Sequence, residues 1–79
     1  MKPMQCRMAR AALQWTTSDL GKRAGVGANT VNRFETGQDA RVSSVDKMRA
    51  ALESAGVIFV EENGEGPGVR LRRPHVERK

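Results

Sequence analysis

The fold is most strongly indicated by residues 16–37, which read TTSDLGKRAGVGANTVNRFETG. Thr16 and Asp19 are spaced as a helix start, in which each side chain accepts a hydrogen bond from the other residue's backbone N–H. Gly25 can end that helix, because glycine readily adopts the left-handed conformation of a helix C-terminus. Ala24 just before it is small, and we expect it to let a second helix approach closely.

A second short helix is predicted from residue 28 to about residue 36. Val31 and Phe34 are three residues apart, so they lie on one face and anchor this helix inward. Gly37 follows where a helix-ending glycine is common. Two short helices joined by a glycine-containing turn of three or four residues form a helix-turn-helix motif. In this motif the outer face of the second helix enters the major groove of DNA.

Two more helices are predicted around the motif. The first covers residues 4–13, and Trp15 follows it as a core residue. Its inward positions are predicted to be Met4, Met8, Ala9, Ala12 and Leu13, and its outward positions Gln5, Arg7, Arg10 and Gln14. The last helix starts at the Ser43–Asp46 pair and ends at Gly56. Its inward positions are predicted to be Val45, Met48, Leu52 and Ala55.

After Gly56 the pattern changes from helical to β. Residues 57–60 are β-branched and aromatic, residues 61–68 are acidic and glycine-rich, and residues 69–72 alternate apolar and basic. This order predicts two strands around a turn. The chain is therefore predicted to be mainly α: a compact four-helix DNA-binding domain over residues 1–56, with a β-hairpin over 57–72 and a flexible basic tail over 73–79.

Length and composition restrict the possible functions. The 79 residues allow one small domain, and the longest apolar run, residues 57–60, is far shorter than the roughly 20 residues of a membrane span. No signal-peptide pattern is found, so we expect a cytoplasmic protein without membrane contact. The net charge is +5, as is typical of nucleic-acid binders.

The charge is unevenly placed along the chain. Residues 1–60 hold nine Lys or Arg and five Asp or Glu, and residues 61–69 hold three Glu and no Lys or Arg. Residues 70–79 hold five Lys or Arg and one Glu. An acidic stretch thus separates a basic body from a basic tail.

Catalytic and metal-binding chemistry find no support in the sequence. The single cysteine, Cys6, excludes an internal disulfide, and its spacing to His75 fits no structural zinc site. The acidic residues Glu61, Glu62 and Glu65 resemble a loop tip rather than a metal site. No nucleophile–base pair or phosphate-cradling glycine loop is present. We expect neither an enzyme nor a metal or cofactor site.

Residues 4–56 resemble the lambda-repressor-like (Cro- or XRE-type) helix-turn-helix regulators. The resemblance rests on ALQWT at 12–16, LGKRAGV at 20–26, TVNRFETG at 30–37 and MRAAL at 48–52. The chain departs from the family at Thr17, where a Gln is frequent, and at Gly27, where a Ser or Thr cap is common. The predicted hairpin stands where many members have a fifth helix.

The resemblance implies roles for individual residues. Its base-reading positions fall on Ala28, Asn29, Asn32 and Arg33. Candidates for binding phosphates are Thr17, Lys22, Arg23, Thr30, Thr36, Arg41, Ser43 and Ser44. Arg can donate two bonds to guanine and Asn can pair with adenine. Three alternatives are open: Arg23 pairs with an acid such as Glu35, Asn32 bonds locally, and Lys22 is simply solvated.

The hairpin is predicted to form a homodimer, because a two-stranded hairpin alone is marginal in water. Two modes are open: pairing of edge strands across a two-fold axis, or packing of Ile58 and Val60 on a partner. The interface residues are predicted to be Val57, Ile58, Phe59, Val60, Val69 and Leu71. The predicted function is a dimeric repressor acting on an inverted-repeat operator. Alternatives are an antitoxin that binds a toxin partner, and a protein-interaction module that occludes another regulator.

Overall fold

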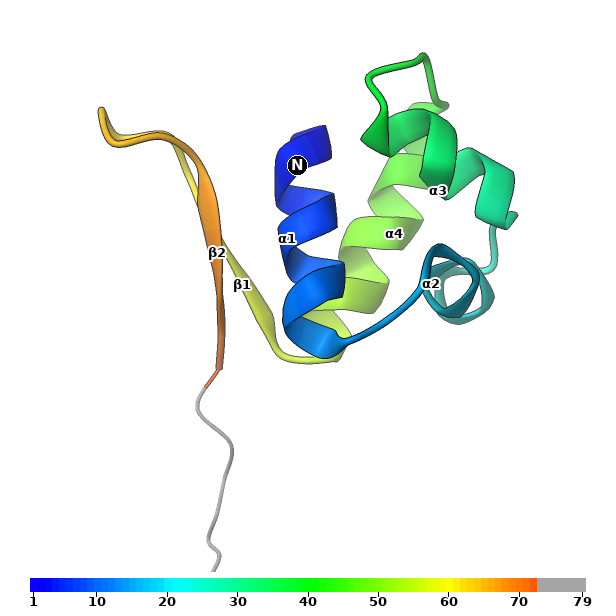
Figure 1. Cartoon of the computed structure of the whole chain (residues 1–79), viewed down its shortest axis with the longest axis horizontal. Helices are drawn as coiled ribbons and strands as arrows, with labels where there is room; N and C mark the ends of the chain where they lie inside the picture. Colours follow the sequence, from blue (N-terminus) through cyan, green and yellow to red (C-terminus); the bar gives the residue numbers. More distant parts are fainter. Residues whose placement is uncertain (73–79) are drawn as a thin grey trace, which may run out of the picture.

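The structure, a computed structural model, describes residues 1–72, and the predicted basic tail over 73–79 lies outside these residues. Four helices are followed by one antiparallel hairpin (Figure 1). The elements are α1 (Pro3–Leu13), α2 (Thr17–Ala24), α3 (Ala28–Glu35), α4 (Val42–Ser54), β1 (Val57–Val60) and β2 (Gly68–Leu71). The predicted mainly helical chain with a C-terminal hairpin is confirmed, and α1 stands between the hairpin and the other helices.

The start and end of α2 are as predicted. The Thr16 N–H donates to Asp19 Oδ2 at 2.8 Å, and the Asp19 N–H donates to Thr16 Oγ1 at 3.0 Å. The bond from the Thr16 N–H holds the pKa of Asp19 below its usual value. Gly25 ends the helix at φ 76°, and its N–H donates to Gly21 O. The capping box and the left-handed glycine therefore fix both limits of this helix.

The close approach of α2 to the following turn occurs at Gly21. A Cβ atom at Gly21 would lie 2.7 Å from Val26 O, closer than real contacts allow. Gly21 O also accepts the N–H groups of Gly25 and Val26. Ala24 is half-buried and packs against the core. Glycine inside a helix costs about 1 kcal/mol relative to Ala, and here it makes room for the turn.

The predicted N-cap of α4, Ser43, is wrong by two residues. Arg41 is the N-cap, with an extended backbone at φ −67° and ψ 140°, and the helix begins at Val42. Ser43 is therefore already helical, and no side chain caps this end. The predicted inward face is confirmed, because Met48 and Leu52 are fully buried.

The core includes residues from all four helices and β1. Its buried members are Cys6, Ala9, Leu20, Val31, Met48, Leu52 and Val57. On α1 the inward face was misassigned: Gln5 is only 3% exposed, whereas Met4 is 45% exposed. The inward face of α1 is set by its partners, because the hairpin and α3 supply polar groups that bond to Gln5 and Arg10.

The hairpin packs on the helices through one face. Its register pairs Val57 with Leu71 and Phe59 with Val69, and β1 runs beside α4 while β2 runs beside α1. Val57, predicted to lie in a dimer interface, is 2% exposed and belongs to the core of its own chain instead. It enters the core because it follows α4 directly. Ile58, on the opposite face of the hairpin, is 38% exposed.

Gln5 links α1 to the hairpin. Its Nε2 donates to Val60 O at 3.1 Å and to Gly68 O at 3.0 Å, and its Oε1 accepts the Lys2 N–H at 2.8 Å. Val60 and Gly68 are the last pair of the ladder before the turn. The buried amide is thus fully engaged at the point where the two strands separate.

A buried polar cluster joins α1 to α3. Glu35, 5% exposed, accepts bonds from Arg10 at 2.6 and 2.7 Å and from the Cys6 thiol at 3.2 Å. Arg7 donates to the Glu35 backbone carbonyl. Arg23 does not pair with Glu35, as one alternative held, because Arg10 on the facing helix occupies both carboxylate oxygens. Instead the Arg23 guanidinium lies 4.5 Å from the centre of the Trp15 ring.

Candidate nucleic-acid interface

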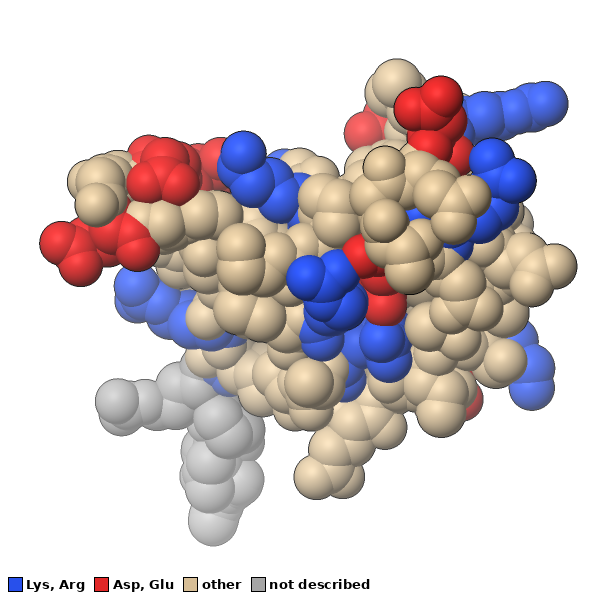
Figure 2. All heavy atoms as spheres, turned by 45° about the horizontal axis from the view of Figure 1, so that its top comes forward, with Lys and Arg blue, Asp and Glu red and all other residues tan. Residues whose placement is uncertain are grey.

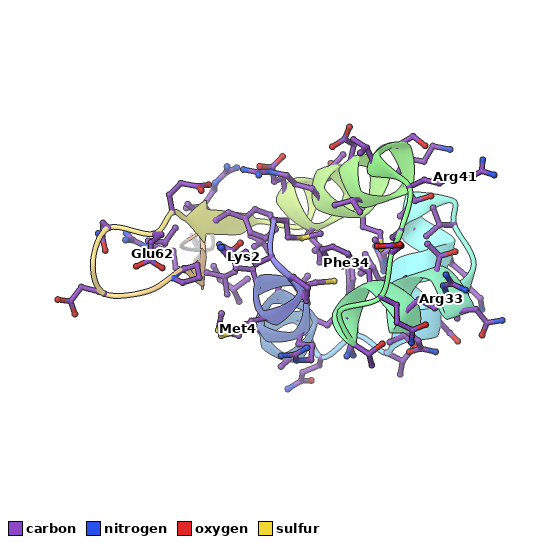
Figure 3. The ribbon with its side chains drawn as sticks, turned by 90° about the horizontal axis from the view of Figure 1, so that it is seen from above. Lys2, Met4, Arg33, Phe34, Arg41 and Glu62 are labelled. Carbon is purple, nitrogen blue, oxygen red and sulfur yellow. The ribbon has the colours of Figure 1, made fainter. Side chains whose placement is uncertain are left out.

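A groove of about 570 Å³ lies between the start of α3 and the start of α4. It is lined by Gly25, Val26, Gly27, Asn29, Thr30, Arg33, Asp39, Ala40, Arg41, Ser44 and Lys47. Figure 3 places Arg33 and Arg41 at the same end of the molecule, far from Glu62 on the hairpin. Five of the predicted DNA-contacting residues, Asn29, Thr30, Arg33, Arg41 and Ser44, therefore meet in one groove.

Two helix N-termini open onto this groove. The N-cap of α3 is Gly27 and that of α4 is Arg41, and neither gives a side-chain bond to its helix. The first backbone N–H groups of a helix have no partner within the helix. Together with the positive end of the helix dipole, such groups favour an anion. The groove can therefore bind a phosphate through backbone as well as side chains.

The outer face of α3 presents Asn29 and Arg33. They are four residues apart, and both are exposed. The Arg33 Nη2 makes one long bond, 3.4 Å, to the backbone carbonyl of Asp39. Within the groove, Asp39 is the acidic residue among three cations, Arg33, Arg41 and Lys47. Because this bond is long and at the surface, the Arg33 side chain can break it and bind a ligand instead.

Asn32 and Thr36 lie on another side of α3. They line a separate hollow between α1 and α3, together with Pro3, Arg7, Glu35 and Gly37. The Thr36 hydroxyl is shared between the backbone carbonyls of Asn32 and Arg33, at 3.0 and 3.1 Å. It also accepts a bond from Gln38. Thr36 is therefore the C-cap of α3, and its hydroxyl bonds to the last turn of that helix. It does not line the groove.

The remaining predicted residues are spread over the surface. Arg23 stacks on Trp15 and lines a second hollow, between α2 and α4. Lys22 and Ser43 are exposed, and Thr17 and Ala28 are half-buried. Thr17 and Ala28 are the first residues of α2 and α3, and Ser43 is the second residue of α4. These three lie at helix N-termini, where backbone N–H groups can contact a phosphate.

Lys47 is a groove residue that sequence reasoning missed. It lines both the groove beside α3 and the hollow between α2 and α4. It lies three residues after Ser44, so helix periodicity places it on the same side of α4. That spacing was the available signal. Lys47 adds a third cation to the groove.

Charge is distributed unevenly over the molecule. On the face in Figure 2, acidic side chains lie at the hairpin end and again at the opposite upper end, and Lys and Arg side chains are spread over the face. Among residues 1–72 no group of three or more His, Cys, Asp or Glu could hold a metal ion. Nor does this part of the chain contain a helix whose length and apolar content would allow it to span a bilayer.

Comparison of the sequence with protein-family models and with curated proteins finds no match. The geometry of the groove and of the outer face of α3 is therefore the basis for assigning a function.

Proposed function

We propose that this chain binds duplex DNA in a sequence-specific way, with α3 in the major groove, and acts as a transcriptional regulator. The observation that carries the proposal is the groove itself. It joins the exposed face of α3 to two uncapped helix N-termini and three cations. The lambda-repressor-like resemblance of residues 4–56 points to the same surface.

Recognition divides between base-reading and phosphate-binding groups. Arg33 donates two hydrogen bonds to O6 and N7 of a guanine, and Asn29 pairs with N6 and N7 of an adenine. Ala28 at the start of α3 contacts a thymine methyl group. Arg41 and Lys47 bind backbone phosphates, which fixes the register of α3 on the duplex without reading sequence.

Binding as a dimer would repress transcription by occupying an operator. Two copies related by a two-fold axis present two α3 helices to half-sites roughly 34 Å apart, one turn of B-DNA. The operator is then an inverted repeat. The concentration of the protein then sets how much of the operator is occupied.

Selection of bound sequences from a random duplex pool, at roughly physiological salt, tests the proposal. We expect enrichment of an inverted repeat whose half-site contains a G and an A. Affinity for the selected site should fall steeply with salt, because neutralised phosphates release counterions. Binding without enrichment would contradict sequence-specific recognition. The protein-interaction and antitoxin alternatives would then be examined by identifying what copurifies.

A further inference from the structure

Both long edges of the hairpin are unpaired within residues 1–72. Arg72 N donates to Gly56 O at 2.7 Å, one step beyond the Val57–Leu71 pair. Hydrogen-bonded pairs alternate along an antiparallel ladder, so Ile58–Arg70 is also a bonded pair. The N–H and C=O groups of Val69 and Leu71 therefore point away from β1, toward the open edge of β2.

The two edges differ in what flanks them. Beside β1, Arg49 of α4 pairs with Glu53 at 3.1 Å and with Glu61 at 4.0 Å, and its guanidinium lies 4.9 Å from the centre of the Phe59 ring. Charged side chains of this kind protect a strand edge from pairing. Beside β2, in addition to Arg70 and Arg72, two apolar side chains are exposed. Leu71 is 44% exposed, and Met4 of the adjacent α1 is 45% exposed on the hairpin side of the molecule (Figure 3).

The two ends of the hairpin carry opposite charge. At the tip, Glu61 and Glu65 are exposed, and Glu62 binds the loop N–H groups of Gly64 and Gly66. At the base, Arg70 and Arg72 are exposed. If two hairpins pair side by side in antiparallel orientation, the acidic tip of each lies beside the basic base of the other. The hairpin is thus self-complementary across a two-fold axis.

We propose that β2 pairs with β2 of a second copy in antiparallel orientation, forming a four-stranded sheet with Val69 on the two-fold axis. This register bonds Val69 to Val69 of the second copy and places Arg70 opposite Gly68 of the second copy. Arg72, one residue beyond β2, then lies beside the loop that holds Glu65 of the second copy. A register centred on Arg70 or Leu71 would instead set arginines opposite each other, which is unfavourable.

This interface is inferred from the hairpin alone. It gives a structure to the dimer of the proposed function, but it does not depend on DNA binding. The tests are therefore made without DNA. Light scattering of the full chain at about 100 µM should give twice the 8.7 kDa mass of one copy. A monomer under these conditions would overturn the proposal, and it would leave recognition of single half-sites by α3 unaffected.

Leu71→Pro tests the edge, and Ile58→Lys is its control. Proline removes the outward N–H of Leu71, which makes no bond inside the hairpin, and proline is tolerated on an edge strand. We expect the dissociation constant of the dimer to rise by at least about tenfold, the effect of 1.4 kcal/mol. Ile58→Lys alters the outer face only and should leave the dimer intact. The reverse result would overturn edge pairing in favour of face packing.

Cross-linking tests the register and does not require a destabilised variant. Gly68 and Arg70 of the second copy form a non-hydrogen-bonded pair, whose Cα atoms lie about 4.5 Å apart, within reach of a disulfide. A Cβ at Gly68 would meet nothing within 4 Å. Oxidation of mixed Gly68→Cys and Arg70→Cys proteins should give the heterodimer, and neither alone should cross-link. A homodimer of Arg70→Cys, or no cross-link, would overturn this register.

Charge exchange tests the pairing of tip with base. Arg72→Glu and Glu65→Arg should each weaken the dimer, and the double variant should restore it, because the opposite charges then meet again. Arg49→Glu, at the β1 edge, is the matched control and should not be rescued by Glu65→Arg. Equal weakening by all three single changes, without rescue, would contradict the antiparallel arrangement.

Discussion

Arg10 and Glu35 form a two-point ion pair between α1 and α3, in which Glu35 is buried and Arg10 is half-buried. Arg10 Nε lies 2.6 Å from Glu35 Oε2, and Arg10 Nη2 lies 2.7 Å from Glu35 Oε1. Arg10 Nη1 also donates to the Trp15 carbonyl at 3.0 Å, so the same side chain holds the junction between α1 and α2. One guanidinium therefore fixes α1 against both the junction and α3.

Arg10→Ala should destabilise the fold by about 3 kcal/mol, because it leaves the Glu35 carboxylate buried without its partner. Urea unfolding, followed by the fluorescence of the single tryptophan, measures the free energy of unfolding. Glu53→Ala is the control, since it breaks the exposed Arg49–Glu53 pair. That change should cost less than about 1 kcal/mol. Equal losses in the two variants would contradict a stabilising role for the buried pair.

Stability should fall on acidification, and Glu35 should account for part of the fall. Burial acts to raise the pKa of Glu35, but the hydrogen bonds from Arg10 and Cys6 outweigh it and hold the pKa below its usual value. A lowered pKa in the folded state stabilises the protein above the unfolded pKa, about 4.3. That contribution is lost as the pH falls through the folded value.

Urea midpoints between pH 7 and pH 3 measure this effect. The wild-type midpoint should decline from about pH 5 downward, and Glu35→Gln should show a lower midpoint at pH 7 with a shallower decline. Glu53→Gln, an exposed carboxylate on α4, serves as the control and should follow the wild type. Parallel curves for wild type and Glu35→Gln would show that Glu35 does not titrate with folding.

The Cys6 thiol should be unreactive in the native protein. Burial, followed by its hydrogen bond to Glu35, raises the pKa of Cys6 to about 12. The thiolate, which is the reactive form, is then scarce at pH 8. A thiol reagent should label Cys6 only after unfolding in urea. Ala12→Cys, on the exposed side of the same helix, should be labelled at once. Rapid native labelling of Cys6 would contradict the described burial.

Much of the fold could be predicted from the sequence, because helix starts and ends depend on hydrogen bonds between residues a few positions apart. The Thr16–Asp19 box and Gly25 define α2 through short-range backbone bonds. The face of α1 could not be predicted in this way. Gln5 is buried because Val60 and Gly68, far along the chain, offer it two carbonyls. Long-range polar partners of this kind leave no periodic signal in the sequence.

For the candidate site as well, some residues could be predicted from the sequence and others could not. Asn29 and Arg33 were predicted from the lambda-repressor-like resemblance, whose base-reading positions fall on them, and both are exposed. The structure separates Asn32 and Thr36 from the groove, since the hollow beside α1 lies on another side of α3. Lys47 was missed because its place in the groove depends on how α4 packs against the α2–α3 turn, which no local pattern encodes.

Arg33→Ala and Arg41→Ala should weaken DNA binding in different ways. Arg33→Ala removes a predicted guanine contact, so it should cost about 1–3 kcal/mol on the selected site and relax the preference at one base position. Arg41→Ala removes a phosphate contact, so it should weaken binding to all sequences alike and reduce the slope of log affinity against log salt by about 1.

Fluorescence anisotropy with the selected duplex, a single-base variant and a random duplex, at several salt concentrations, measures both effects. Lys47→Ala should behave like Arg41→Ala, because both cations line the groove at the start of α4. Lys2→Ala is the matched control, since Lys2 is an exposed cation outside the groove lining. If Arg33→Ala lowered the affinity for all three duplexes equally, Arg33 would be a phosphate contact and α3 would not read the base assigned to it.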